Sequence, residues 1–163
     1  MKNSLLAGLF GVALSVASCS TVSNAKTAQQ NRAEFLKLKG DWEITSVEYD
    51  RSLRVKPFDE GADATCFIGS HWRLIPNNYS GAYTLNGASG CPALTQPIKF
   101  EMVGGNTFLF KKLIEGSKAK AVTQGYALTL VDQSTDQFSL QQNIPFEGKT
   151  VRVVYHFQRT ASK

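Results

Sequence analysis

The chain has 163 residues and a formal net charge of +5, from 18 lysines and arginines against 13 aspartates and glutamates. This length fits one domain, and a hydrophobic share of 42% is enough to form a buried core. The basic residues are scattered and no nucleic-acid-binding motif is present, so we expect no nucleic-acid partner.

The amino-terminal segment 1–18 has the pattern of a signal peptide. Its apolar run, Leu5–Ala17, would reach only ~20 Å as a helix, short of a ~30 Å hydrocarbon core. The run ends in Val16-Ala17-Ser18-Cys19, which resembles the lipobox of bacterial lipoproteins, in which the cysteine is acylated, for example with palmitate. We therefore predict cleavage before Cys19 and lipidation of that cysteine. The alternative is a soluble secreted protein cut near Ser18 or Ala25.

Residues 19–30 follow with small, polar side chains that cannot bury much surface, and this composition predicts a flexible tether. Ser20 stands where an aspartate would retain a lipoprotein in the inner membrane, so the sequence resembles those sorted to the outer membrane. No acidic cluster follows. We predict a lipid-anchored protein of the outer membrane whose domain faces the periplasm.

Two cysteines remain besides Cys19. In an oxidising compartment, Cys66 and Cys91 are most simply a disulfide, and the alternative is a pair of free buried thiols. No CxxC motif is present, and His71 and His156 stand alone, so no metal site is predicted.

Residues 31–159 are predicted to form the folded domain and 160–163 a tail. A short helix is expected first, with Asn31 and Glu34 as a capping box and Gly40 at its end. The pattern then changes to strict alternation of apolar and polar residues, which is typical of strands with one buried face. It recurs about eight times, at Trp42 and Ile44, Trp72 and Leu74, Tyr83 and Leu85, Ile98 to Met102, Phe108 and Phe110, Tyr126 to Leu130, Phe138 and Leu140, and Val151 to Phe157.

The connections indicate hairpins. Turn residues occupy 77–81, 103–106 and 132–136, and no helical crossover separates the strands. Closing such a meander removes its two exposed edges. The predicted fold is therefore all-β: an eight-stranded antiparallel up-and-down β-barrel with a short N-terminal helix. The segment 55–67 breaks the alternation and is expected to form a loop with one helical turn across a barrel opening.

Gly40-Asp41-Trp42, after a short helix and at the start of the first strand, resembles the G-x-W motif of lipocalins. That resemblance implies that Trp42 closes one end of the barrel under an arginine from the end of the chain, for which Arg159 is the matching residue. More specifically, residues 38–159 resemble small bacterial lipocalin-family lipoproteins, through the stretches "VKPFDEGADATCFIGSHW" and "IPNNYSGAYTL" and the "EGK" turn. Gly40, Trp42 and Arg159 are thus the expected barrel-closing residues.

The inward-facing set by parity is rich in aromatic residues, and two interpretations stay open. The rings can fill the barrel outright, or they can line a cup near its open end that holds an acyl chain or another apolar molecule. The candidate ligand-binding residues, taken from strand ends, are Tyr49, Trp72, Tyr83, Phe100, Phe110 and Tyr126.

No catalytic motif or cofactor-binding motif is present, so we expect neither an enzyme nor a cofactor. Asp59, Glu60 and Asp63 cluster as in an acid pair or a weak calcium site, but their irregular spacing favours turn and helix-start roles. Two functions remain. One is a membrane-anchored carrier of a small apolar ligand. The other is a filled-barrel interaction module, either an accessory subunit of an outer-membrane complex or an inhibitor, with a membrane protein as partner.

Overall fold

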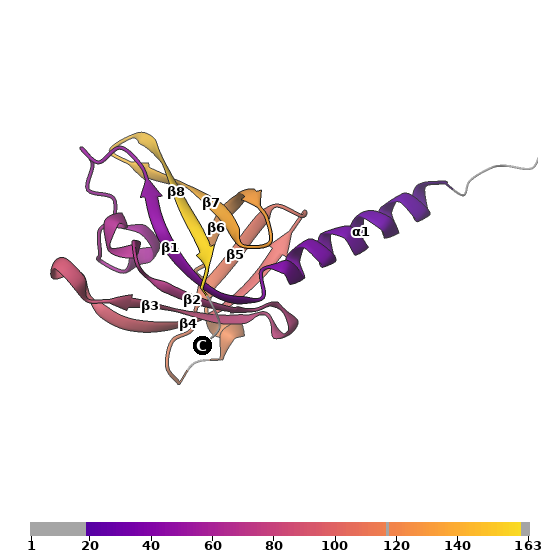
Figure 1. The fold of residues 1–163 in the computed structure, drawn as a ribbon, viewed down its shortest axis with the longest axis horizontal. Coiled ribbons are helices and arrows are strands. Elements are labelled where there is room, and N and C mark those ends of the chain that lie inside the picture. Colours follow the sequence, from indigo (N-terminus) through magenta and orange to yellow (C-terminus); the bar gives the residue numbers. More distant parts are fainter. Residues whose placement is uncertain (1–18, 117, 161–163) are drawn as a thin grey trace, which may run out of the picture.

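The computed structural model describes residues 19–116 and 118–160, as one closed barrel with a helix projecting from it (Figure 1). The predicted signal peptide and the last three residues of the predicted tail lie outside the described residues. The elements in chain order are one helix and eight strands: α1 (Cys19–Lys37), β1 (Gly40–Glu48), β2 (His71–Ile75), β3 (Ser80–Asn86), β4 (Ala93–Val103), β5 (Thr107–Lys112), β6 (Tyr126–Gln133), β7 (Gln137–Phe146) and β8 (Lys149–Arg159).

Each strand pairs antiparallel with the next, and β8 pairs back with β1, so the sheet has no free edge. The register places Trp42 opposite Arg159 on one side and opposite Trp72 on the other. The predicted all-β, eight-stranded antiparallel barrel is confirmed.

The residues that alternate toward the inside form the core. The largest fully buried side chains are Trp42, Tyr83, Tyr155, Phe67, Phe108, Phe138, Leu38, Ile44, Leu74, Leu85, Ile98 and Leu140. Rings of neighbouring strands stack directly, as do Trp72 and Tyr83, whose centroids are 4.7 Å apart, and Phe138 and Phe157, at 4.3 Å. Such contacts add to the free energy that burial of each ring provides.

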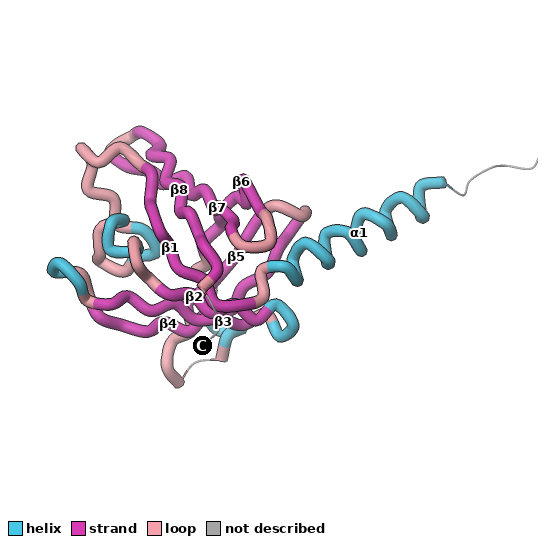
Figure 2. The backbone as a smooth tube through the Cα atoms, viewed as in Figure 1, coloured by secondary structure: helices cyan, strands magenta, loops and turns pink. Residues whose placement is uncertain are grey.

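The barrel has two different ends. At the helix end, α1 enters β1 and the tight turns of the β2–β3, β4–β5 and β6–β7 hairpins lie together. At the lid end lie the long β1–β2 connection and the connections after β3, β5 and β7 (Figure 2). Residues 50–70, between β1 and β2, are called the lid below.

Helix α1 is longer than the sequence predicted. It begins at Cys19, whereas a flexible tether was expected over residues 19–30 and a helix capped by Asn31. Alanine, glutamine and lysine make up five of the six residues 25–30, and these residue types favour a helix whether or not one face is buried. Residues 24–30 are helical although all of them are exposed. The sequence prediction inferred a flexible tether from the lack of apolar side chains, and that inference was wrong here.

Only the last turns of α1 pack on the barrel. Phe35 contacts the rings of Tyr79 and Phe100, with centroids 5.6 and 5.5 Å away, and Leu38 is fully buried. Asn31 lies so close to the β4–β5 turn that a side chain at Gly105 would collide with it. Aromatic contacts thus fix α1 to the helix end, and the rest of the helix projects into solvent (Figure 1).

Arg159 completes this end. Its guanidinium carbon lies 4.1 Å from the centroid of the Trp42 ring, and the indole nitrogen of Trp42 donates to the Leu38 carbonyl at 2.9 Å. The same guanidinium donates to the carbonyls of Lys37, Lys39 and Thr135. Gly40 has φ +141°, and a side chain there would collide with the guanidinium. These contacts explain why a glycine stands two residues before the tryptophan.

Candidate ligand-binding site

The lid inserts side chains into the barrel mouth. It carries two short 3-10 helices, Pro57–Asp59 and Ala64–Phe67, which agrees with the expected loop across an opening (Figure 2). Phe58 is 3% exposed and Phe67 is fully buried, so two rings absent from the strand pattern belong to the core.

Phe58 is surrounded by aromatic rings. Its centroid lies 5.0 Å from that of Phe110, 5.3 Å from that of Phe67, and 5.5 Å from those of both Tyr126 and Tyr155. The sequence left open whether the barrel is filled or has a cup at its open end. In this conformation the lid end is filled, because a lid side chain occupies the place that a ligand would take.

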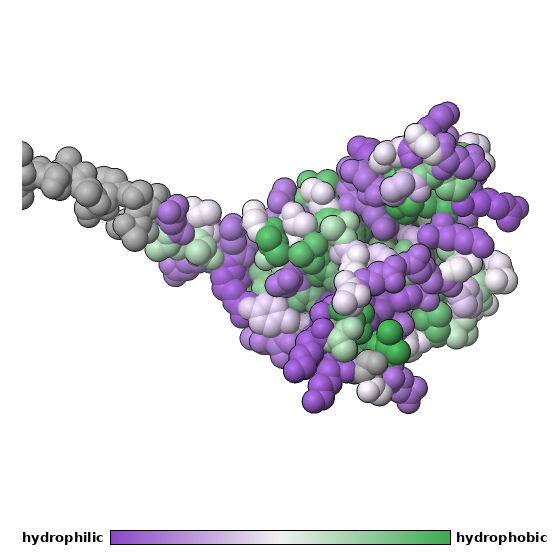
Figure 3. Space-filling view, turned by 180° about the vertical axis from the view of Figure 1, so that it is seen from behind, coloured by the Kyte–Doolittle hydropathy of each residue, from purple (hydrophilic) through white to green (hydrophobic). Residues whose placement is uncertain are grey.

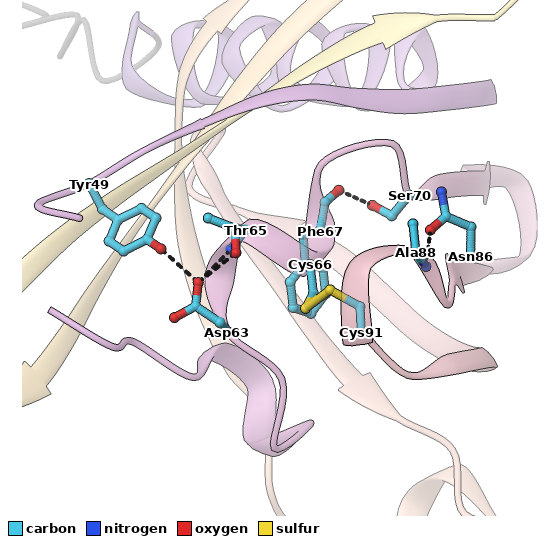
Figure 4. The surroundings of a disulfide bond; sticks show 9 residues. All are labelled: Tyr49, Asp63, Thr65, Cys66, Phe67, Ser70, Asn86, Ala88 and Cys91. Atoms are coloured by element: carbon cyan, nitrogen blue, oxygen red, sulfur yellow. Dashed lines mark hydrogen bonds between the residues drawn. A yellow bond between two sulfur atoms is a disulfide. The ribbon is translucent and has the colours of Figure 1, made fainter. Parts of the chain in front are cut away.

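The later part of the lid is fixed covalently. Cys66 is bonded to Cys91 in the β3–β4 connection, with their Cα atoms 5.5 Å apart (Figure 4). Asp63 accepts hydrogen bonds from the hydroxyl of Tyr49 at 2.7 Å, and from the backbone and hydroxyl of Thr65 at 3.0 and 2.8 Å. Burial alone would raise the pKa of Asp63, but these hydrogen bonds outweigh it and hold the pKa below its ordinary value.

Each of the three clustered lid carboxylates accepts a hydrogen bond from a tyrosine. Asp63 bonds to Tyr49, Glu60 to Tyr83, and Asp59 to Tyr126 at 2.8 Å. Burial, followed by these hydrogen bonds, raises the pKa of Tyr49 to about 12 and raises the pKa values of Tyr83 and Tyr126 well above their ordinary range. The cluster therefore fastens the lid, and the three side chains do not converge on a common point.

A partly buried ion pair lies next to these bonds. Lys112 on β5 places its ammonium 2.7 Å from Glu60 and 2.9 Å from the carbonyl oxygen of Phe58. The side chain of Glu60 is 7% exposed and that of Lys112 is 22% exposed. Removal of either partner would leave the other charge without its counter-charge, with only the Phe58 carbonyl beside Lys112 or the Tyr83 hydroxyl beside Glu60.

The structure brings most of the candidate ligand-binding residues to the lid end. Tyr83, Phe110 and Tyr126 lie beneath or beside the lid, and Trp72 packs against Tyr83 and Phe110. Tyr49 holds Asp63 from the end of β1. Phe100 lies apart from them, toward the helix end, against Phe35 and Phe108.

Phe58, Phe67 and Lys112 were not among the predicted site residues. No periodicity in residues 55–67 shows which lid side chains point inward. The inward orientation of Lys112 could have been predicted, because Lys112 alternates in step with the inward-facing Phe108 and Phe110 on the same strand. A charged residue on the inner face of a barrel strand needs a partner or a function.

The outer face of the barrel carries a groove. The groove has a volume of about 510 Å³ and runs across β4, β5 and β6. It is lined by Lys99, Glu101, Leu109, Lys111 and Ala127, and also by three of the predicted candidates, Phe100, Phe110 and Tyr126. The first five of these residues alternate with the buried Phe100, Phe110 and Leu128, so their side chains point away from the barrel axis. Hydrophobic residues also lie in patches among hydrophilic ones on the face shown in Figure 3.

Within residues 19–116 and 118–160, no group of three or more histidine, cysteine, aspartate or glutamate side chains is arranged to hold a metal ion. No helix in this described part of the chain is both long and apolar enough to span a bilayer.

No family model matches the sequence, and no curated protein matches it either. The fold has solved neighbours. Lobster apocrustacyanin A1 is 12% identical with a TM-score of 0.51, over 89% of this chain and 73% of the other. Apocrustacyanin C2 is also 12% identical, with a TM-score of 0.51, over 88% of this chain and 72% of the other. The bovine lipocalin allergen Bos d 2 is 13% identical with a TM-score of 0.45, over 80% and 77%.

The two apocrustacyanins share the fold of this chain, a closed eight-stranded barrel with one helix. At this level of identity the likeness concerns the fold alone, and the function has to be argued from the residues of this chain.

Proposed function

We propose that this protein is a non-catalytic binding protein that takes a small apolar ligand into the lid end of its barrel. The observation that carries this proposal is the aromatic enclosure formed by Phe67, Phe110, Tyr126 and Tyr155, whose occupant is a single lid side chain, Phe58. The lid is not a strand of the sheet. One disulfide and backbone hydrogen bonds to Ile44 hold its later part, whereas side-chain contacts hold residues 57–60, and such a segment can move while the barrel stays closed.

The proposal includes a lipid anchor at Cys19 and a location at the outer membrane. The sequence around Cys19 supports it, and so does the placement of α1, which leaves the barrel at the end opposite the lid (Figure 1). An anchor at the start of α1 would leave the lid end free to exchange a ligand.

A second candidate function is that of an interaction module with a filled barrel, whose partner is a membrane protein. The stacked rings along the barrel favour this alternative, because in the closed conformation they leave the mouth occupied. The outer groove on β4–β6 would then be the more useful surface.

Native mass spectrometry can distinguish the carrier from the interaction module. The full chain is released from non-ionic detergent, and its binding of the probe N-phenyl-1-naphthylamine is measured. We expect saturable binding of one molecule and a gain in affinity in Phe58→Ala, which vacates the enclosure. The matched control is Leu74→Val, a change at a buried position at the helix end, away from the lid. If neither the wild type nor Phe58→Ala binds this probe or its sulfonated analogue, 8-anilinonaphthalene-1-sulfonate, the result contradicts a carrier and favours the module.

Metabolic labelling with radioactive palmitate tests the anchor. The wild type should be labelled and retained in membranes, and Cys19→Ala should lose both properties. The Cys66→Ser/Cys91→Ser variant, which keeps Cys19, should retain the label. Membrane retention of the Cys19→Ala chain would contradict the anchor.

A further inference from the structure

The hydrogen bonds that residues 58–60 of the lid make to the barrel all run in one direction. The wall contributes only donors, and residues 58–60 of the lid contribute only acceptors. The donors are the Tyr83 hydroxyl, the Lys112 ammonium, the Gln124 amide and the Tyr126 hydroxyl, and the acceptors are the Phe58 carbonyl and the carboxylates of Asp59 and Glu60.

This asymmetry has a consequence for the open state. If residues 57–60 leave the mouth, Glu60 and the Phe58 carbonyl leave with them, whereas Lys112 stays on β5. The ammonium of Lys112 then loses both of its acceptors, and the hydroxyl of Tyr83 loses Glu60. These donors would border an aromatic interior, where an unpaired polar group costs free energy and an unpaired charge costs more.

Phe58 resembles a bound molecule in its contacts. Its ring lies among four aromatic rings, and its carbonyl oxygen accepts from Lys112 at 2.9 Å. Its backbone has φ +58°, and that of the next residue, Asp59, has φ +51°. The left-handed region is unfavourable for residues with a side chain, so the lid is held closed against backbone strain.

The disulfide leaves room for this part of the lid to move. Cys66 is fixed to Cys91, and Asp63 and Thr65 bond to each other beside it. Residues 57–60 precede this fixed part, and their bonds to the wall are all made by lid acceptors that a ligand could replace.

We propose that the ligand of the lid end is an amphipathic anion. Its apolar body takes the place of the Phe58 ring. Its carboxylate, sulfonate or phosphate end takes the place of the Glu60 carboxylate on Lys112 and Tyr83. This inference rests on the proposed function, and it adds the charge of the ligand and assigns Lys112 as the residue that selects it.

Two variants that break the same ion pair test it. Glu60→Gln leaves the Lys112 ammonium at the mouth, and Lys112→Gln leaves the Glu60 carboxylate. The probes are 8-anilinonaphthalene-1-sulfonate and N-phenyl-1-naphthylamine, which share an aromatic skeleton and differ in the sulfonate. Native mass spectrometry of the full chains gives the affinity for each probe. Both variants also weaken the lid, which changes the affinity for both probes. Dividing the affinity for the sulfonate by that for the neutral probe, within each variant, cancels this effect.

For each variant we compare the affinity for the sulfonate with that for the neutral probe. We expect this ratio to be ~10-fold or more higher in Glu60→Gln than in Lys112→Gln, because a hydrogen bond to a charged group contributes a free energy of that size. Lys112→Arg should keep the preference. The wild type should bind the sulfonate more tightly than the neutral probe. This measurement does not require any variant to fold.

Equal ratios in Glu60→Gln and Lys112→Gln, or a wild-type preference for the neutral probe, would overturn the anionic ligand and leave the proposed function intact. Failure of both probes to bind any of the four proteins would overturn the proposed function together with this inference.

Discussion

The guanidinium of Arg159 lies over the indole ring of Trp42, 4.1 Å from its centroid, although the two residues lie near opposite ends of the domain. The same side chain donates to the carbonyl of Lys37, the last residue of α1, and to that of Lys39 just beyond it. One residue therefore joins the last strand, the first strand and the helix.

Substitution of Arg159 by alanine is expected to lower the free energy of unfolding by ~2–3 kcal/mol, since a cation–π contact and several charge-assisted hydrogen bonds are lost. Arg159→Lys should recover little, because an ammonium cannot bond to three separated carbonyls while it covers the ring. Urea unfolding followed by tryptophan fluorescence measures this. The control is Arg152→Ala, an exposed position on the same strand, with a change of ~0.5 kcal/mol or less. An equal effect at both positions would contradict the role of Arg159.

Gly40→Ala is expected to destabilise the barrel by ~2 kcal/mol. The new methyl group would collide with the Arg159 guanidinium, and φ +141° is unfavourable for alanine. Gly90→Ala is the matched control: it also has a positive φ, of +80°, but no atom lies near its added methyl group. Its loss should be ~1 kcal/mol, the backbone contribution alone. Equal losses in urea unfolding would show that the contact with Arg159 does not matter.

The disulfide closes a separation of 25 residues, so its loss in Cys66→Ser/Cys91→Ser should lower stability by ~3.5 kcal/mol in the chain-entropy account. Thermal unfolding with and without dithiothreitol checks this within one experiment. The wild type should shift with reductant toward the double variant, and the double variant should not shift. A wild type that does not respond to reductant would mean that the bond contributes little.

Alkaline pH is expected to unfold the protein. In the folded state the pKa of Tyr49 is raised to about 12, mainly by burial. Burial raises the pKa values of Tyr83, Tyr126 and Tyr155 as well. Unfolded tyrosines ionise near pH 10, so this stabilisation is complete below about pH 10 and is lost as the pH rises toward 12.

Absorbance at 295 nm and far-UV circular dichroism, recorded in the same titration, test this prediction. The tyrosinate signal should appear mainly together with the loss of secondary structure. Ionisation of these phenols near pH 10 in a chain that keeps its circular dichroism would be the contrary result.

The barrel could be predicted because strand alternation needs only local sequence. Trp42 and Ile44, or Phe108 and Phe110, share a parity that any two-sided sheet would give them. Arg159 could be paired with Trp42 only through the lipocalin resemblance, because nothing local relates residues so distant in sequence.

The lid shows where local patterns stop being informative. Phe58 has a left-handed backbone in a segment without alternation, so its inward orientation depends on the tertiary contacts of its ring. Asp59 and Glu60 bond to Tyr126 and Tyr83, and these partners follow from the register of the strands rather than from spacing. The start of α1 was also missed, because exposed helix formers leave no amphipathic pattern.

Hydrogen exchange of lid amides in the presence of 8-anilinonaphthalene-1-sulfonate tests the account most directly. The amide of Glu60, which bonds to the carbonyl of Pro57, lies in the segment 57–60 that is proposed to leave the mouth and reports on its displacement. A saturating probe should accelerate exchange in the peptide that contains Glu60 and leave the strands protected. Unchanged or slower exchange there, with the probe bound, would show that the ligand does not displace the lid and would contradict the account.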